Sequence, residues 1–149
     1  MLVLYTGAAV LSLQDSARHE GPGVAMALSL DVSRTGDTAV VTCRGRIVFG
    51  EEADELRRVV LDLLKETKRI VLNLAGVGHI DSSGLGTLAA SFISARHRRA
   101  EIKFAALSPR THRVLTITNV DRLFEVYEST EQAIKSFGRH PDATLGKTG

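Results

Sequence analysis

The sequence predicts one α/β domain, with a mixed, mostly parallel sheet of four to five strands and about four helices. Three observations support this prediction. The chain has 149 residues, which suits a single domain with its own core. Short apolar or alternating runs typical of strands take turns with longer runs whose apolar residues recur at helical spacing. This alternation favours crossovers between parallel strands, while one short connection near the start favours an antiparallel pair.

The predicted domain opens with a hairpin. Residues 28–33 alternate apolar and polar side chains, which is typical of a half-buried strand. Turn residues at 34–37 lead to a second strand over residues 39–44, and so short a connection makes the two strands antiparallel. A loop is expected over residues 45–50. The hairpin is the reason why a mixed sheet is predicted.

The middle of the chain carries a helix, a buried strand and another helix. Apolar residues at helical spacing predict the first helix over about residues 51–67, and its acidic first turns complement the helix dipole rather than mark a metal site. Residues 70–74 are almost entirely apolar, which suits a strand buried on both faces. After a loop at residues 75–79, the next helix is predicted from residue 83 to about residue 97.

Two further strand and helix pairs complete the predicted order. A parallel strand is expected over residues 102–106, followed by a helix over residues 108–119 that opens with a serine cap and a proline. A short strand over residues 123–127 follows. The last helix begins at Ser129, which forms a capping-box pattern with Gln132.

The ends of the chain are expected to lie outside this domain. We predict a disordered extension over residues 1–25, the domain over residues 26–138 and a flexible tail over residues 139–149. Residues 2–13 are apolar, but no lysine or arginine precedes them and the following context is poor for cleavage, so no signal peptide is predicted. No apolar run approaches the ~20 residues of a membrane-spanning helix. The expected location is cytoplasmic.

The composition excludes several classes of function. A formal net charge of +2 and 5% aromatic residues give little support for binding nucleic acid. The single cysteine, Cys43, excludes an internal disulfide and a multi-cysteine metal site, and we expect it to be buried in a strand. No metal or cofactor is predicted.

The most informative stretch is the run Asp-Ser-Ser-Gly-Leu-Gly over residues 81–86. Ser82 and Ser83 stand where a helix begins, near the carboxyl end of the central strand, where a serine can cap the first turn. We expect one or both hydroxyls to stand at the positive end of the helix dipole. Such a position suits a phosphate or a docking partner. Gly84 and Gly86 weaken a helix by up to ~1 kcal/mol each, so their use is expected to be close approach by another backbone. These features favour a docking surface over capping alone.

Enzymatic interpretations of the same stretch are weak. His79, Asp81 and Ser82 are neighbours in sequence, whereas the members of a catalytic triad are neighbours in space and rarely adjacent in the chain. Ile80 occupies the position where a nucleophile elbow needs glycine. The glycines at 76 and 78 lack the third small residue of a dinucleotide fingerprint, and no Walker-type lysine follows. We therefore predict that the chain is not an enzyme.

The sequence resembles a STAS domain, the anti-sigma-factor antagonist fold of bacteria, over roughly residues 27–138. The resemblance comes from the apolar strand, the run at residues 81–86, the helix after it, and the Ser108-Pro109 pair that opens another helix. In family members of the antagonist type, a partner kinase phosphorylates the serine directly after the aspartate. By position, that serine is Ser82.

The resemblance implies a binding module with a phosphorylation switch. The unphosphorylated chain would bind an anti-sigma factor that is also a serine kinase, and a phosphatase would act on phosphorylated Ser82. The implied docking surface around Ser82 consists of Asp81, Ser83, Gly84, Leu85 and Thr87. The alternative is a STAS accessory subunit of a lipid-transport or other membrane complex, which would meet the membrane only through its partners.

One departure from the family pattern concerns the run Gly-Arg-Ile-Val at residues 45–48. Arg46 stands where family antagonists usually have glutamate, and Val48 stands where they have an aspartate that helps engage the kinase. Two interpretations of Arg46 remain open. It contacts an acidic partner or the phosphate itself, or it is an ordinary solvated arginine.

Overall fold

The computed structural model describes residues 2–4 and 28–138. Strands and helices alternate along them as the sequence predicts. In chain order the elements are β1 (Leu2–Leu4), β2 (Ser29–Thr35), β3 (Thr38–Ile47), α2 (Glu51–Leu63), β4 (Arg69–Ile80), α3 (Ser82–His97), β5 (Glu101–Ala105), α4 (Pro109–Ile117), the 3₁₀ turn η1 (Val120–Arg122), β6 (Val126–Tyr127) and α5 (Thr130–Gly138).

The strands form one sheet in the order β1-β2-β3-β4-β5-β6. The pairs β1–β2 and β2–β3 are antiparallel, and the three pairs from β3 to β6 are parallel. The predicted fold class, a mixed and mostly parallel sheet, is therefore confirmed. Five of these strands lie within the predicted domain.

The sixth strand, β1, departs from what the sequence predicts. Leu2–Leu4 falls in the extension predicted to lie outside the domain, yet it pairs with β2, where Leu2 lies opposite Ser33. Without β1, the outer edge of β2 would leave a row of unpaired backbone groups. The rest of the predicted extension and the predicted tail at 139–149 lie outside the described residues.

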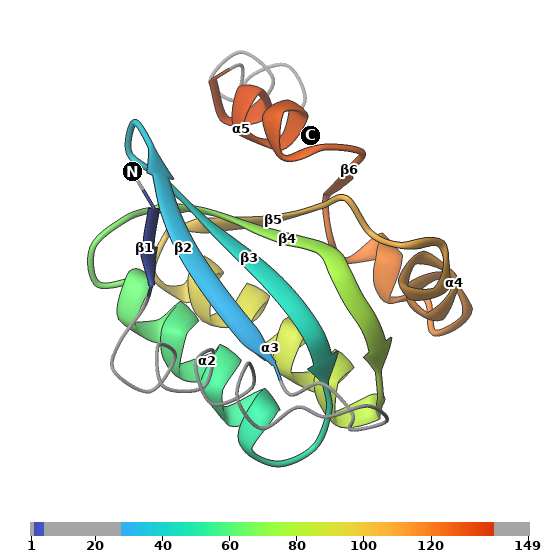
Figure 1. The fold of residues 1–149 in the computed structure, drawn as a ribbon. Coiled ribbons are helices and arrows are strands. Elements are labelled where there is room, and N and C mark those ends of the chain that lie inside the picture. The colour runs from blue at the N-terminus through green and yellow to red at the C-terminus, as the bar shows by residue number, and fades with distance from the viewer. Residues whose placement is uncertain (1, 5–27, 139–149) are drawn as a thin grey trace.

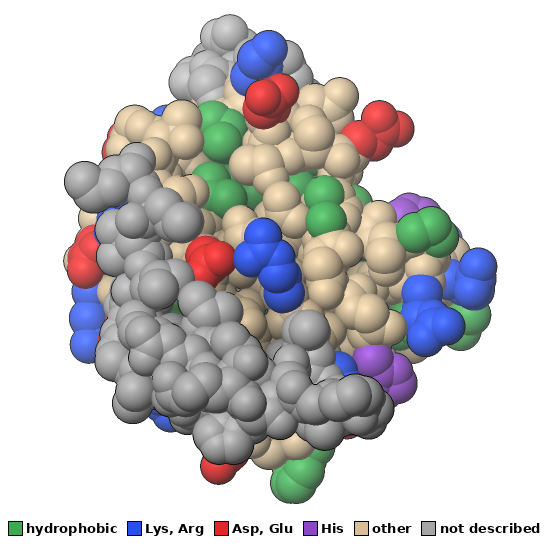
Figure 2. Space-filling model, in the orientation of Figure 1, with side chains coloured by type: hydrophobic (Ala, Val, Ile, Leu, Met, Phe, Trp, Pro, Cys, Tyr) green, Lys and Arg blue, Asp and Glu red, His purple; other side chains and the backbone are tan. Residues whose placement is uncertain are grey.

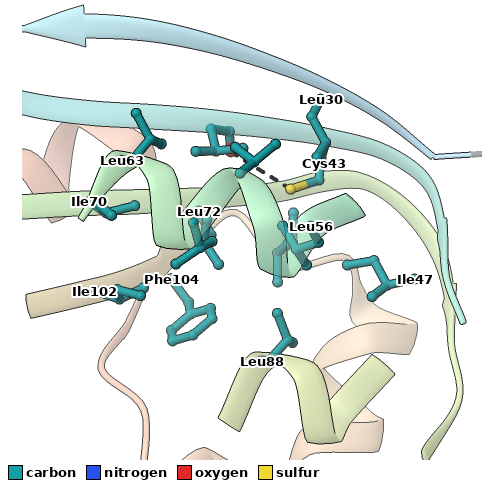
Figure 3. Close-up of a cluster of buried hydrophobic side chains, with 14 of the residues drawn as sticks. Leu30, Cys43, Ile47, Leu56, Leu63, Ile70, Leu72, Leu88, Ile102 and Phe104 are labelled. Carbon is teal, nitrogen blue, oxygen red and sulfur yellow. Dashed lines mark hydrogen bonds between the residues drawn. The ribbon is translucent and has the colours of Figure 1, made fainter. Parts of the chain in front are cut away.

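Helices cover the sheet unequally. Figure 1 shows α2 and α3 side by side on one face and α5 on the other, with α4 near the end of β4. The larger core lies between the sheet and the α2–α3 pair, and its side chains converge there from both layers (Figure 3). A smaller cluster, which includes Val40, Val71 and Phe137, packs under α5. The α2–α3 face therefore holds most of the buried apolar surface.

The loop predicted over residues 75–79 is wrong because β4 continues through it, and the loop predicted over residues 45–50 is confirmed only for residues 48–50. β3 extends to Ile47 and β4 to Ile80, and these two residues are paired in parallel register. Glycines interrupt the apolar pattern here, and one of them, Gly76, meets a structural need. A Cβ on Gly76 would lie 2.8 Å from the side chain of Arg44 on β3. The register shifts near Thr42 and Gly45 mark irregular pairing in the same region.

Other local predictions hold. The Ser108 hydroxyl accepts a hydrogen bond from the Thr111 N–H at 3.2 Å, and Ser129 does the same for Gln132 at 3.1 Å. Cys43 is buried as expected, and burial raises the pKa of its thiol to about 12. In contrast, the helix predicted over residues 51–67 ends at Leu63, and the strand predicted over residues 123–127 is reduced to Val126–Tyr127.

Candidate functional site

The candidate site lies where β3 and β4 end and α3 begins. Figure 1 shows the two arrowheads above the first turn of α3, with the chain from β3 passing down to α2. We define the site as residues 46–50, which span the end of β3 and its connection to α2, and residues 81–87 at the start of α3. Both segments lie at the carboxyl ends of parallel strands, which is a common place for functional groups in α/β folds.

Asp81, not a serine, caps α3. Its Oδ1 atom accepts a hydrogen bond from the Gly84 N–H at 2.8 Å, and Asp81 itself has an extended backbone. Ser82 and Ser83 are the first two residues of the helix. Neither serine is therefore the cap, although both lie in the first turn, at the positive end of the helix dipole. The capping residue must stand before the first helical residue to reach the N–H three positions on, and Asp81 occupies that place.

The second carboxylate oxygen of Asp81 holds a different segment. Its Oδ2 atom accepts a hydrogen bond from the Phe49 N–H at 3.1 Å. The backbone N–H of Asp81 donates to the Ile47 carbonyl at 3.4 Å. The backbone donors Gly84 and Phe49, in that order, lower the pKa of Asp81 below its usual value. Asp81 is therefore ionised at neutral pH and ties the β3–α2 segment to the start of α3.

Ser82 is exposed, whereas Ser83 is half-buried. The Ser82 hydroxyl makes no hydrogen bond to any residue that the structure describes. It stands in the first turn of α3, where unpaired backbone N–H groups and the helix dipole favour negative charge. Of the two serines, Ser82 is the one that an enzyme or a partner can reach directly.

The two glycines of this segment have different surroundings. Gly84 is buried, and a Cβ there would lie 2.0 Å from the Ile47 carbonyl oxygen. The backbone that approaches it is therefore β3 of the same chain. Gly86 is exposed, and a Cβ there would meet no atom within 4 Å. Nothing within the described residues requires Gly86.

The remaining predicted docking residues are partly accessible. Leu85 is half-buried and packs against the main core, and Thr87 is half-buried as well. Asp81, Ser83, Leu85 and Thr87 therefore share the start of α3 with the exposed Ser82. Gly84 belongs to the same turn, but it lies inward.

Arg46 has a partner within the chain. Its Nη2 atom lies 3.8 Å from an Oε2 atom of Glu52 in the first turn of α2, and its side chain is 41% exposed. In the parallel register of the sheet Arg46 lies opposite His79. This ion pair favours a local role for Arg46 over an isolated, solvated guanidinium. Val48, at the other departing position, is half-buried.

Sequence reasoning missed Phe49. The side chain is 79% exposed, and its backbone is bonded to Asp81. A phenylalanine in a short segment that ends in glycine, between a strand and a helix, is the signal that could have found it. It is the most exposed large apolar side chain in the described part of the molecule.

The described surface gives no sign of a metal centre. Within residues 2–4 and 28–138, no three His, Cys, Asp or Glu side chains are grouped so that they could hold a metal ion. Among the same residues, no helix has the length and apolar character that crossing a bilayer requires.

Figure 2 shows acidic and basic side chains interspersed over the described part of one face, with Lys and Arg gathered near α4.

Comparisons with known proteins identify the family. The model of the STAS domain matches residues 29–133. A STAS-domain containing protein of Pseudomonas aeruginosa is 30% identical over 101 residues, which are 68% of this chain and 99% of that protein. An anti-sigma-B factor antagonist of Listeria monocytogenes is 33% identical over 63 residues, 42% of this chain and 55% of that protein.

Solved structures share the fold. An anti-sigma factor antagonist from Mycobacterium paratuberculosis has a TM-score of 0.66 at 22% identity, and the match covers 74% of this chain and 93% of that one. The phosphorylated form of SpoIIAA, a cell fate determinant of Bacillus, has a TM-score of 0.59 at 16% identity, with 73% and 99% covered. A sulfate transporter family protein from Wolinella succinogenes has a TM-score of 0.60 at 20% identity, with 68% and 84% covered. This chain belongs to the STAS domain family.

Proposed function

We propose that this chain is an anti-sigma-factor antagonist that works by phosphorylation-controlled partner switching. The unphosphorylated form binds an anti-sigma factor that is also a serine kinase, and phosphorylation of Ser82 releases it. The observation that carries this proposal is the exposed Ser82 hydroxyl in the first turn of α3, with no hydrogen bond to a described residue. The anti-sigma-B factor antagonist among the relatives supports the class of partner.

The charge chemistry of the site explains how such a switch would work. A phosphate adds about −1.5 to −2 charges. The start of α3 offsets this by ~0.3–1 kcal/mol when exposed, while the ionised Asp81 beside it opposes the added charge. The free domain therefore tolerates phosphorylation. An interface that covers Ser82 would have to bury the dianion, and each ~1.4 kcal/mol lost lowers the affinity tenfold.

The cycle requires other proteins. A phosphatase must remove the phosphate from Ser82 before the chain can bind again. In this proposal the chain is a cytoplasmic binding module with no catalytic activity of its own, and transcription is affected through the sigma factor that the partner releases.

A second candidate function is a STAS subunit of a lipid-transport or other membrane complex. The observation in its favour is the shared fold with the sulfate transporter family protein. Because that likeness concerns the fold alone, the identity of the bound partner must separate the two candidates.

The test is capture of partners from native lysate on wild-type, Ser82→Asp and Ser83→Asp baits. We expect a kinase-type anti-sigma factor on the wild-type bait, identified by mass spectrometry, and its loss from the Ser82→Asp bait. The half-buried Ser83 serves as the matched control and should retain more of the partner. Capture of a membrane transporter instead, or equal capture by the wild-type and Ser82→Asp baits, contradicts the proposal.

A further inference from the structure

Phe49 exposes 79% of its side chain in the segment between β3 and α2. Single exposed apolar residues are normal on protein surfaces, so this exposure alone assigns no role. Aromatic rings are, however, enriched at protein interfaces, where they bury a large apolar area. The surroundings of Phe49 decide between these two cases.

The ring stands on a rigid support. The Phe49 N–H donates to Asp81 at 3.1 Å, and the Ala53 N–H donates to the Val48 carbonyl at 3.2 Å. The following residue, Gly50, adopts a φ of 108°, which other residues rarely reach. An exposed ring on a fixed backbone loses little freedom on binding, and this lowers the cost of association.

One carboxylate connects this ring to the phosphorylation position. Asp81 accepts the Phe49 N–H with one oxygen and the Gly84 N–H with the other, at 3.1 and 2.8 Å. Ser82 directly follows Asp81 in the chain. The backbone of Phe49 therefore lies one hydrogen bond from the residue before Ser82.

Acidic residues follow Phe49 in the chain. Glu51 and Asp54 are exposed in the first turn of α2, and neither has an ion-pair partner among the described residues. Glu52 is engaged by Arg46. With the Asp81 carboxylate, which accepts the Phe49 N–H, these residues make the segment that carries the ring acidic. A phosphate on Ser82 would add like charge to it.

We propose that the Phe49 side chain is the apolar anchor through which this chain binds its partner. We also propose that Asp81 couples this anchor to the Ser82 switch, because its carboxylate bonds both the Phe49 N–H and the start of α3. The proposal rests on the proposed function, and the occupant is the same anti-sigma factor. Its binding surface would offer an apolar socket for the ring. A phosphate on Ser82 adds charge that this interface would have to desolvate, so the partner is released.

The test measures the affinity of the purified anti-sigma factor for four forms of the full chain. Phe49→Ala should weaken binding at least about tenfold, and Phe49→Leu should restore part of the loss. Ile117→Ala is the matched control, because Ile117 is 71% exposed on α4, outside the site. It should bind like wild type. The amide NMR spectra of the three variants should resemble the spectrum of the wild type, which would show that the variants are folded.

A further variant tests the connection through Asp81. An asparagine has one side-chain oxygen, so Asp81→Asn cannot accept both backbone donors. We expect faster hydrogen exchange at the Phe49 amide and weaker binding than wild type. If Phe49→Ala binds like wild type while Ser82→Asp releases the partner, the anchor is wrong and the proposed function stands. If the wild type itself binds no anti-sigma factor, the proposed function fails and the anchor with it.

Discussion

Gly84 and Gly86 lie two residues apart in α3, yet their surroundings differ. At Gly84 a Cβ would lie 2.0 Å from the Ile47 carbonyl oxygen, whereas at Gly86 it would meet nothing within 4 Å. The first glycine lets α3 begin directly against the end of β3. The second opens toward solvent. One short signature therefore combines residues that the fold requires with residues that lie on the surface.

The same division separates the polar residues of the signature. Asp81 caps the helix and holds the neighbouring segment, so its role is structural as well as electrostatic. Ser82 has no such internal contact with the described residues. A change on the inner side should therefore affect folding first, and a change on the outer side should affect binding first.

The largest effect on stability is expected for Gly84→Ala. The added methyl group would overlap a backbone carbonyl that cannot rotate away, so we expect a loss at or above ~3 kcal/mol, the upper end for overpacking. Urea unfolding measures it. Gly86→Ala is the matched control and should raise the free energy of unfolding by up to ~1 kcal/mol. Equal losses for both variants would contradict the difference between the two glycines.

A smaller effect, which depends on pH, is expected for Asp81→Ala. Loss of the cap should cost about 0.5–2 kcal/mol at pH 7. Because hydrogen bonds lower the pKa of Asp81 in the folded state, its contribution is present above the unfolded value of about 3.9 and is lost as the pH falls through the folded value. The difference in the free energy of unfolding between the variant and wild type should therefore be smaller at pH 3 than at pH 7. A gap that stays constant would exclude this role.

The smallest effect is expected at the rim of the site. The ion pair between Arg46 and Glu52 is partly exposed and 3.8 Å long, so its coupling energy should be about 0–1 kcal/mol. A double-mutant cycle with Arg46→Gln and Glu52→Gln measures it. A coupling well above this range would show that Arg46 fixes the β3–α2 segment more strongly than its geometry suggests.

The sequence predicts those features that depend on local pattern. The alternation of strands and helices, the Ser108 cap and the burial of Cys43 all follow from neighbouring residues and are confirmed. The continuation of β4 through Gly76 was missed because it depends on contact with Arg44 on another strand. The pairing of β1 was missed for the same reason.

The site shows the same limit. That the 81–86 run begins a helix is visible in the sequence, but which residue caps it depends on where the helix starts, one position earlier than predicted. The inward role of Gly84 depends on Ile47, far away in the chain. The place of Phe49 in the site depends on its hydrogen bond to Asp81, a residue distant in the chain, so the local sequence could not reveal it.

The most direct test of the switch uses phosphoserine itself. The purified anti-sigma factor is titrated against the chain before and after enzymatic phosphorylation, with mass spectrometry placing the phosphate on Ser82. We expect binding at least about a hundredfold weaker after modification, or ~2.7 kcal/mol. Unchanged affinity with a full phosphate on Ser82 would contradict the account.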